Sequence, residues 1–127
     1  MHLRNTVIKL ALPLGLLAIA LAATGNGQSG TIKGYVLDSA CAFTKNLKKP
    51  VSSECAVACA KAGSPLVILS DDGTIYWPIA DATPASGQND KLLPFAGQKV
   101  TATGNIFERG GSRALVIDKV EALSSSK

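Results

Sequence analysis

The stretch KVTATGNIFERGGSRALVIDKV, residues 99–120, decides the fold of this chain. From 99 to 107, apolar or small residues alternate with polar ones, which is the two-residue period of a half-buried β-strand. Gly110 and Gly111 suit a tight turn, and residues 113–120 return as a second strand. The stretch therefore predicts an antiparallel β-hairpin, and the segments before it must complete the sheet.

Three further strands are predicted upstream of this hairpin, over residues 31–39, 66–70 and 74–79. A turn at Asp71-Asp72-Gly73 joins the last two, because glycine supplies the positive φ of such a turn. Adjacent residues of a strand point to opposite faces. We therefore expect Trp77 in the core, together with Ile75 and Ile79, and Tyr76 on the outside.

A short helix is predicted between the first two of these five strands. Ser52 or Ser53 can cap its start, it runs to about Ala62, and Gly63 suits its end. The remaining connections are predicted as loops at 40–51 and 80–90 and a single helical turn at 91–96, closed by Gly97. Five strands in so short a chain need an arrangement that hides their edges, and a closed barrel does this with few residues. We therefore expect a mainly β domain over residues 31–123, a five-stranded barrel with one helix after the first strand.

The chain also resembles a known group of proteins, in the stretches Gly34-Tyr35-Val36-Leu37-Asp38 followed by Cys41, Cys55 and Cys59 before Lys61-Ala62-Gly63, and residues 93–104 (LPFAGQKVTATG). It resembles small secreted bacterial domains of the OB-fold type with a DxxC…CxxxC pattern, many of them functionally uncharacterised. The resemblance covers residues 30–120 and implies an OB-like barrel and a cysteine pattern rather than an activity. Such domains often carry a histidine between the first and second cysteines, and this chain has none there. The usual OB-fold places its helix after the third strand, whereas the helix predicted here follows the first.

The N-terminus has the three parts of a secretory signal peptide. A basic start is followed by an apolar run over residues 10–23 and by Ala20-Leu21-Ala22, the small residues that signal peptidase requires. This run is shorter than the ~20 residues that span a bilayer, so no stable membrane anchor is expected after cleavage. We expect a periplasmic or secreted protein, divided into a signal peptide at 1–22, a flexible leader at 23–30, the barrel at 31–123 and a disordered tail at 124–127.

Cleavage after Ala22 changes the charge and the available chemistry. Removing Arg4 and Lys9 from the 13 basic residues leaves 11 against 9 acidic ones, a net charge of +2 instead of +4. The single histidine, His2, is lost as well. The mature chain then has no Ser-His-Asp triad, no Cys-His pair and no imidazole metal ligand. We expect no enzymatic activity and, given the low charge, no nucleic-acid partner.

Three cysteines, Cys41, Cys55 and Cys59, carry the remaining chemistry. In an oxidising compartment we expect one disulfide, from Cys41 to Cys55 or Cys59, with the third thiol left over. Cys55 and Cys59 are less suited to each other, because side chains one helical turn apart run roughly parallel. The alternative is a thiolate site for copper or zinc, with Asp38 as a possible oxygen ligand, or a thiol-redox role.

A possible ligand surface combines two exposed tyrosines with a lysine-rich loop. Its predicted members are Tyr35, Tyr76, Lys45, Lys48 and Lys49. The interpretation at this point is a secreted or periplasmic binding module without a cofactor, whose partner is a protein or a small molecule.

Overall fold

The computed structural model describes residues 27–45 and 51–123. The predicted signal peptide at 1–22, the first half of the leader (23–26), the tail at 124–127, and Lys48 and Lys49 lie outside the described residues. In the described part of the chain, no helix combines the length and the apolar character needed to cross a membrane.

The described residues form strands and short helices in the order β1 (Gln28–Asp38), α1 (Ser39–Thr44), α2 (Ser53–Lys61), β2 (Leu66–Ser70), β3 (Ile75–Pro78), α3 (Asn89–Leu92), the 3₁₀ helix η1 (Leu93–Phe95), β4 (Lys99–Arg109) and β5 (Ser112–Ala122). These five strands close into a barrel in the order β1-β2-β3-β5-β4, with β4 paired back to β1. Neighbouring strands are antiparallel except β3 and β5, which are parallel. The expected mainly β fold, a small five-stranded OB-like barrel, is confirmed.

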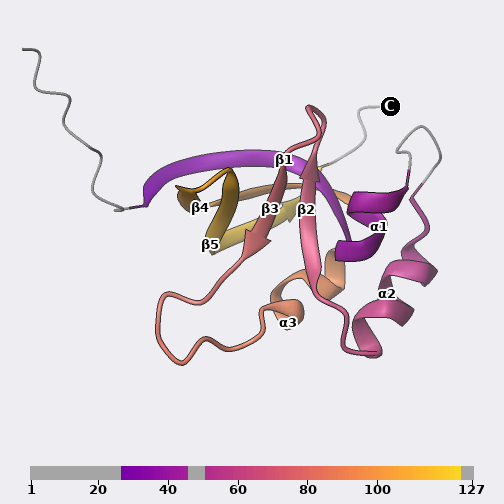
Figure 1. Ribbon diagram of the computed structural model, residues 1–127. Coiled ribbons are helices and arrows are strands. Elements are labelled where there is room, and N and C mark those ends of the chain that lie inside the picture. The colour runs from indigo at the N-terminus through magenta and orange to yellow at the C-terminus, as the bar shows by residue number, and fades with distance from the viewer. Residues whose placement is uncertain (1–26, 46–50, 124–127) are drawn as a thin grey trace, which may run out of the picture.

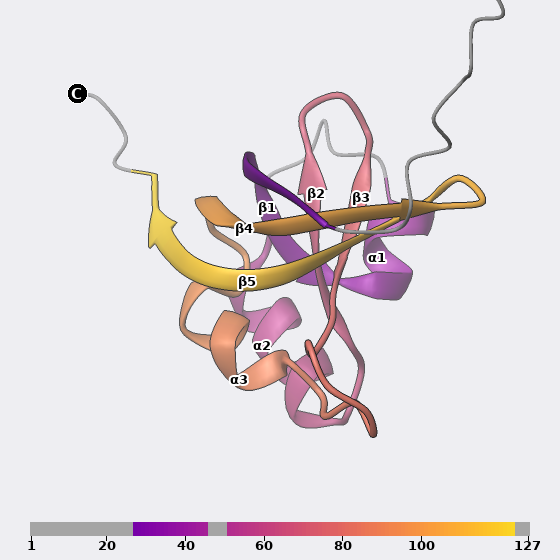
Figure 2. The ribbon, with the colours of Figure 1, turned by 90° about the vertical axis from the view of Figure 1, so that its left-hand side faces the viewer.

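The helices lie outside the barrel. Figure 1 shows α1 and α2 together at one side, while α3 lies beneath the barrel. Figure 2 shows the long β4–β5 hairpin running across the β2–β3 hairpin, as expected where a small sheet closes on itself. This steep crossing leaves part of the outer face of the sheet beyond the reach of the helices.

The β4–β5 hairpin has the predicted structure. Its turn places Gly110 and Gly111 at φ values of 55° and 81°, a backbone region that side chains disfavour. The pairing shifts register between Thr103 and Gly104. At that point a Cβ on Gly104 would overlap the carbonyl oxygen of Val116, so only glycine allows the two backbones to approach so closely.

Most of the predicted helical structure is present, but the prediction of one helix is wrong. The helix predicted from Ser52 is α2, which begins where the Ser52 hydroxyl accepts a hydrogen bond from the Cys55 N–H at 3.2 Å. The predicted loop at 40–51 instead begins with the six-residue helix α1, which is too short for hydrophobic periodicity to reveal. The helical turn near 91–96 starts earlier, at Asn89.

The first strand also begins earlier than predicted. Gln28, Ser29 and Gly30, which the sequence assigned to a flexible leader, already pair with β4 and therefore belong to the barrel. A run of small polar residues is poor in strand-formers, so its pairing comes from the neighbouring strand rather than from its own propensity.

The barrel interior is filled by one cluster of buried side chains: Ile32, Val36, Leu66, Ile68, Tyr76, Leu92, Val100, Ala102, Leu115 and Ile117. A second cluster, the outer cluster, lies between the sheet and α1 and contains Leu37, Ala42, Val67 and Leu69. All of β2 except its last residue is buried because it contributes side chains to both clusters. Within the described residues, α1 thus covers part of the outer face of β1 and β2.

The prediction for the two adjacent aromatic residues of β3 is wrong. Tyr76 is 9% exposed and lies in the barrel interior, whereas Trp77 and Ile75 pack against the outer cluster. Ile79 lies beyond the end of β3. Alternation correctly separates Tyr76 from Trp77, but the sequence does not show that α1 provides an apolar environment on the outer face as well.

Candidate functional site

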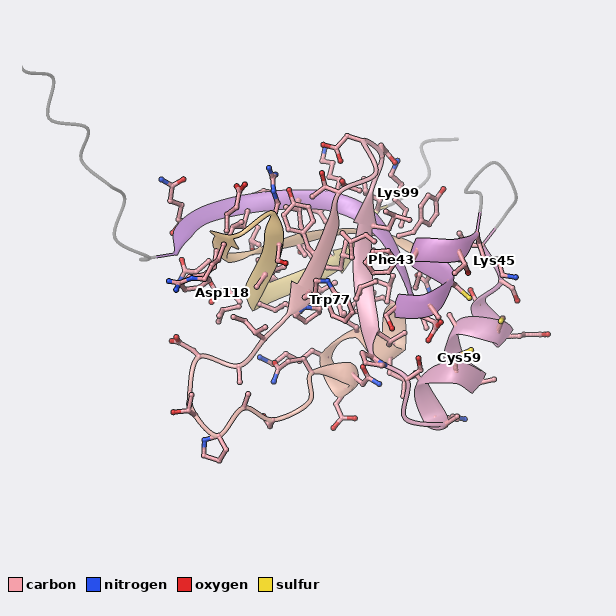
Figure 3. All side chains as sticks on the ribbon, viewed as in Figure 1. Phe43, Lys45, Cys59, Trp77, Lys99 and Asp118 are labelled. Atoms are coloured by element: carbon pink, nitrogen blue, oxygen red, sulfur yellow. The ribbon has the colours of Figure 1, made fainter. Side chains whose placement is uncertain are left out.

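Three cysteines gather where α1 and α2 come together. Cys41 belongs to α1, while Cys55 and Cys59 lie one turn apart in α2. Figure 3 shows the sulfur atoms in yellow in this region, with Cys59 labelled. None of these described cysteines is bonded, and one pair lies 4.1 Å apart, far beyond an S–S bond of about 2.0 Å. The predicted disulfide is therefore not formed in this structure, and the thiol–thiol hydrogen bond that is present joins Cys55 and Cys59.

Asp38 positions Cys41. Its side chain is the N-cap of α1 and accepts a hydrogen bond from the Cys41 N–H at 3.0 Å. Its second oxygen accepts a hydrogen bond from the Ser64 hydroxyl, on the segment between α2 and β2. That bond to Ser64 is the main reason why the pKa of Asp38 lies below its ordinary value, although burial opposes the shift. The residue, 5% exposed, is thus a buried carboxylate that joins both helices to the barrel.

The electrostatics of this region favour protonated thiols. Burial raises the pKa of Cys41, and the nearby Asp38 carboxylate raises it further. Burial is also the main reason why the pKa of Cys59 is raised, and its hydrogen bond with Cys55 raises it further. Because the thiolate is the reactive form, these two thiols are weak nucleophiles at neutral pH.

The predicted metal ligands share this region without forming a metal site. Asp38, Cys55 and Cys59 are near enough to Cys41 to raise its pKa. Across the described ranges, however, no group of three or more His, Cys, Asp or Glu side chains is placed to hold a metal ion. A tetrahedral zinc site, which needs four ligands around one point, does not fit this arrangement.

The predicted ligand surface is not assembled. Tyr76 is inside the barrel, and Tyr35 is half-buried beside the outer cluster, with the Lys99 ammonium 5.7 Å from its ring centroid. Lys45 is exposed at the C-terminal end of α1. Tyr35 and Lys45 therefore do not combine with Tyr76 into one exposed surface.

A different surface, which the sequence did not predict, lies on the outer face of the barrel beside Trp77. Trp77 on β3 pairs with Ala114 on β5, and Ala114 pairs with Phe107 on β4. These three residues line a hollow of about 340 Å³ together with Arg109, Ser112 and Arg113. On the other side of Trp77, the exposed ring of Phe43 from α1 lies with its centroid 6.4 Å from the indole (Figure 3). We call this surface the Trp77 hollow.

Two arginines give the Trp77 hollow a positive charge. Arg113 forms an ion pair with Glu108 at 3.5 Å, and its pKa is raised mainly by a hydrogen bond with Tyr76 at the barrel mouth. Arg109 is exposed and makes no ion pair within the described residues. The hollow thus combines aromatic walls with at least one unpaired cation. The hydrophobic periodicity of the sequence could not have revealed the Trp77 hollow, because the parallel pairing of β3 with β5 joins segments far apart in the sequence.

A second hollow adjoins Trp77 on the side of α3. It has a volume of about 370 Å³ and is lined by Gly63, Pro65, Leu66, Trp77, Pro78 and residues 86–90. Asn89 holds its wall by accepting from the Leu66 N–H and donating to the Ser64 carbonyl, both at 2.8 Å. The side-chain oxygen of Gln88 is buried there without a hydrogen-bond partner among the described residues. Trp77 therefore stands between two concave surfaces.

Comparison with known proteins adds no family to these observations. No family model, no curated protein and no solved structure matches the chain. The cysteines and the Trp77 hollow are therefore the features that bear on function.

Proposed function

We propose that this protein is an exported binding or interaction module, a small β-barrel whose helices α1 and α2 are joined by a disulfide from Cys41 to Cys55 or Cys59. The observation that carries the proposal is the position of Cys41 on α1, near enough to Cys55 and Cys59 of α2 for both to raise its pKa. The signal-peptide pattern at residues 1–22 supports export to a compartment where disulfides persist. The resemblance to small secreted OB-fold domains agrees with this assignment.

Helix geometry favours Cys41 as one partner of the proposed bond. Cys55 and Cys59 project from one face of α2, and regular helix geometry keeps their Cα–Cβ bonds roughly parallel. Cys41 approaches from α1, near enough to Cys55 and Cys59 for both to raise its pKa. This bond would fix α1 against α2 and leave one thiol free.

The proposal is tested on protein exported to the bacterial periplasm and purified without reductant. Intact mass should show a chain that begins at Ala23 and has lost two hydrogens, and thiol titration should find one free cysteine. The Cys41→Ser variant should retain two free thiols, whereas one of Cys55→Ser and Cys59→Ser should retain none. Three free thiols in the exported wild-type protein, or an unprocessed N-terminus, would contradict the proposal.

A soft metal ion is the second candidate, because the buried Asp38 carboxylate lies beside the thiols. The negative charge of Asp38, which disfavours a thiolate at Cys41, would attract a bound cation. With no three-ligand set among the described residues, the form that remains is Cu(I) held between two thiolates. The raised pKa values of Cys41 and Cys59 do not favour thiol–disulfide exchange.

Metal binding is tested by adding Cu(I) to the reduced protein without oxygen and recording native mass spectra. One bound ion that is lost in Cys41→Ser and retained in Lys61→Ala would support this second candidate. If the exported protein forms its disulfide even when copper is supplied, the metal-binding candidate is rejected.

A further inference from the structure

We infer that the Trp77 hollow binds a small ring that carries a carboxylate, either an aromatic acid or an acidic sugar. The inference deepens the proposed binding function and rests on it. It starts from the row of side chains formed by Trp77, Ala114 and Phe107, which paired strands place on one face of the sheet. Trp77 and Phe107 are both partly exposed there.

The small side chain of Ala114 makes room for a ring. Neighbouring strands lie about 4.8 Å apart, so Trp77 and Phe107 begin about 10 Å from each other with only a methyl group between them. A flat ring in van der Waals contact needs about 3.5–4 Å on each side. One ring therefore has room above Ala114 against Trp77 or Phe107, whose own ring reaches toward Gly27 on the other side of β4.

The boundary with α1 explains why this part of the outer face is open. Trp77 packs against the outer cluster, in which Ala42 of α1 covers the paired residues Val67 and Leu37 of β2 and β1. Beyond Trp77 no helix of the described chain covers the sheet, and the concave surface remains. Partly exposed aromatic side chains in a concave surface are typical of ligand sites.

The charge selects an anion. Arg109 lies two residues beyond Phe107 on β4 and therefore points to the same face. It makes no ion pair in the part of the chain that is described, whereas the neighbouring acid Glu108 is paired with Arg113. The planar guanidinium of Arg109 matches a carboxylate through two parallel hydrogen bonds.

The position of the single tryptophan provides the readout. The full chain contains one Trp, so both its fluorescence and its indole N–H resonance report on Trp77, which lines this hollow and the one beside α3. The variants at Arg109 and Ala114, which line only the Trp77 hollow, distinguish the two surfaces. Benzoate and glucuronate are titrated against their uncharged counterparts, benzamide and glucose, with the oxidised, exported protein. For ligands of this size we expect a dissociation constant on the order of 1 mM for at least one acid. The uncharged counterpart should bind about tenfold more weakly or not at all.

Three variants test the assignment. Arg109→Ala should weaken binding of the acid about tenfold, whereas Lys61→Ala, which removes an exposed lysine of α2, should leave it unchanged. Ala114→Leu should abolish binding by filling the hollow, and its amide spectrum should show that the fold is retained. Since Ala114 is partly exposed, this larger side chain does not enter the barrel interior.

Each outcome decides the inference. Binding of benzoate alone identifies an aromatic acid, and binding of glucuronate alone identifies an acidic sugar. Equal binding of acid and uncharged counterpart, no binding of either acid, or full binding to Ala114→Leu would overturn the inference. A Trp77 signal that changes only with protein concentration would assign the surface to self-association instead. Mass and thiol count, measured on the same sample, show independently whether the proposed disulfide and export hold.

Discussion

Reducing the proposed disulfide should lower the free energy of unfolding by about 3 kcal/mol. In the chain-entropy model, a cross-link stabilises a protein by restricting the unfolded chain, and the effect depends on loop length. The loop closed from Cys41 to Cys55 has about 15 residues and that to Cys59 about 19, which gives about 3.0 and 3.2 kcal/mol. Both pairings therefore predict the same loss, so stability measures the bond without identifying its second partner.

Urea unfolding with and without dithiothreitol measures this loss. For a domain of this size the denaturant slope is about 1–1.5 kcal/mol/M, so the reduced protein should unfold at a urea concentration about 2–3 M lower. The barrel should retain its fold when reduced, because its interior cluster does not include a cysteine.

The cysteine variants show whether the loss of stability on reduction comes from a disulfide at Cys41. Cys41→Ser should unfold like the reduced wild-type protein whether or not reductant is present. Of Cys55→Ser and Cys59→Ser, one should behave in the same way and the other should keep the response to reductant. If Cys41→Ser still responds to reductant while the wild-type protein loses one disulfide, the bond joins Cys55 to Cys59 and the reasoning from helix geometry fails.

Three further substitutions test how the site is built. Asp38→Asn should cost about 1.5–3 kcal/mol at neutral pH, because it replaces the charge that Ser64 stabilises. Because the pKa of Asp38 is lowered in the folded protein, the stability that this carboxylate contributes is lost as the pH falls below about 4. Urea unfolding of the Asn variant should lack that part of the pH dependence. Gly104→Ala should cost about 3 kcal/mol or more, or abolish folding, since its Cβ would overlap the Val116 carbonyl oxygen, and thermal unfolding will show this. Asn89→Ala should cost about 1–3 kcal/mol in urea unfolding, because it leaves two backbone groups without hydrogen bonds.

The elements with strong local signals could be predicted from the sequence. The β4–β5 hairpin follows from alternation and from Gly110-Gly111, and α2 follows from the cap at Ser52 and the glycine at its end. The turn at Asp71-Asp72-Gly73 is likewise present, since Gly73 has a φ of 86°. In each case the information lies within a few neighbouring residues.

What the sequence did not reveal depends on distant pairing. The helix α1 exists because Asp38, at the end of β1, caps it and because Ala42 packs on β2. Without α1, the outer face of β3 is expected to be solvated, and Trp77 is then assigned to the interior in place of Tyr76. The Trp77 hollow could not be predicted either, because it requires β3 to lie parallel to β5.

The segment inserted between β1 and β2 links the two candidate sites. Its helix α1 carries Cys41 on the side that meets α2 and Phe43 on the side that meets Trp77. The same helix is fixed to the barrel by the buried Asp38 cap and by Ala42 in the outer cluster. A bond at Cys41 would therefore fix the ring of Phe43 beside the indole and set the edge of the Trp77 hollow. In this arrangement the cysteines stabilise the ligand surface, and the chemistry of recognition belongs to the aromatic and arginine side chains of the barrel.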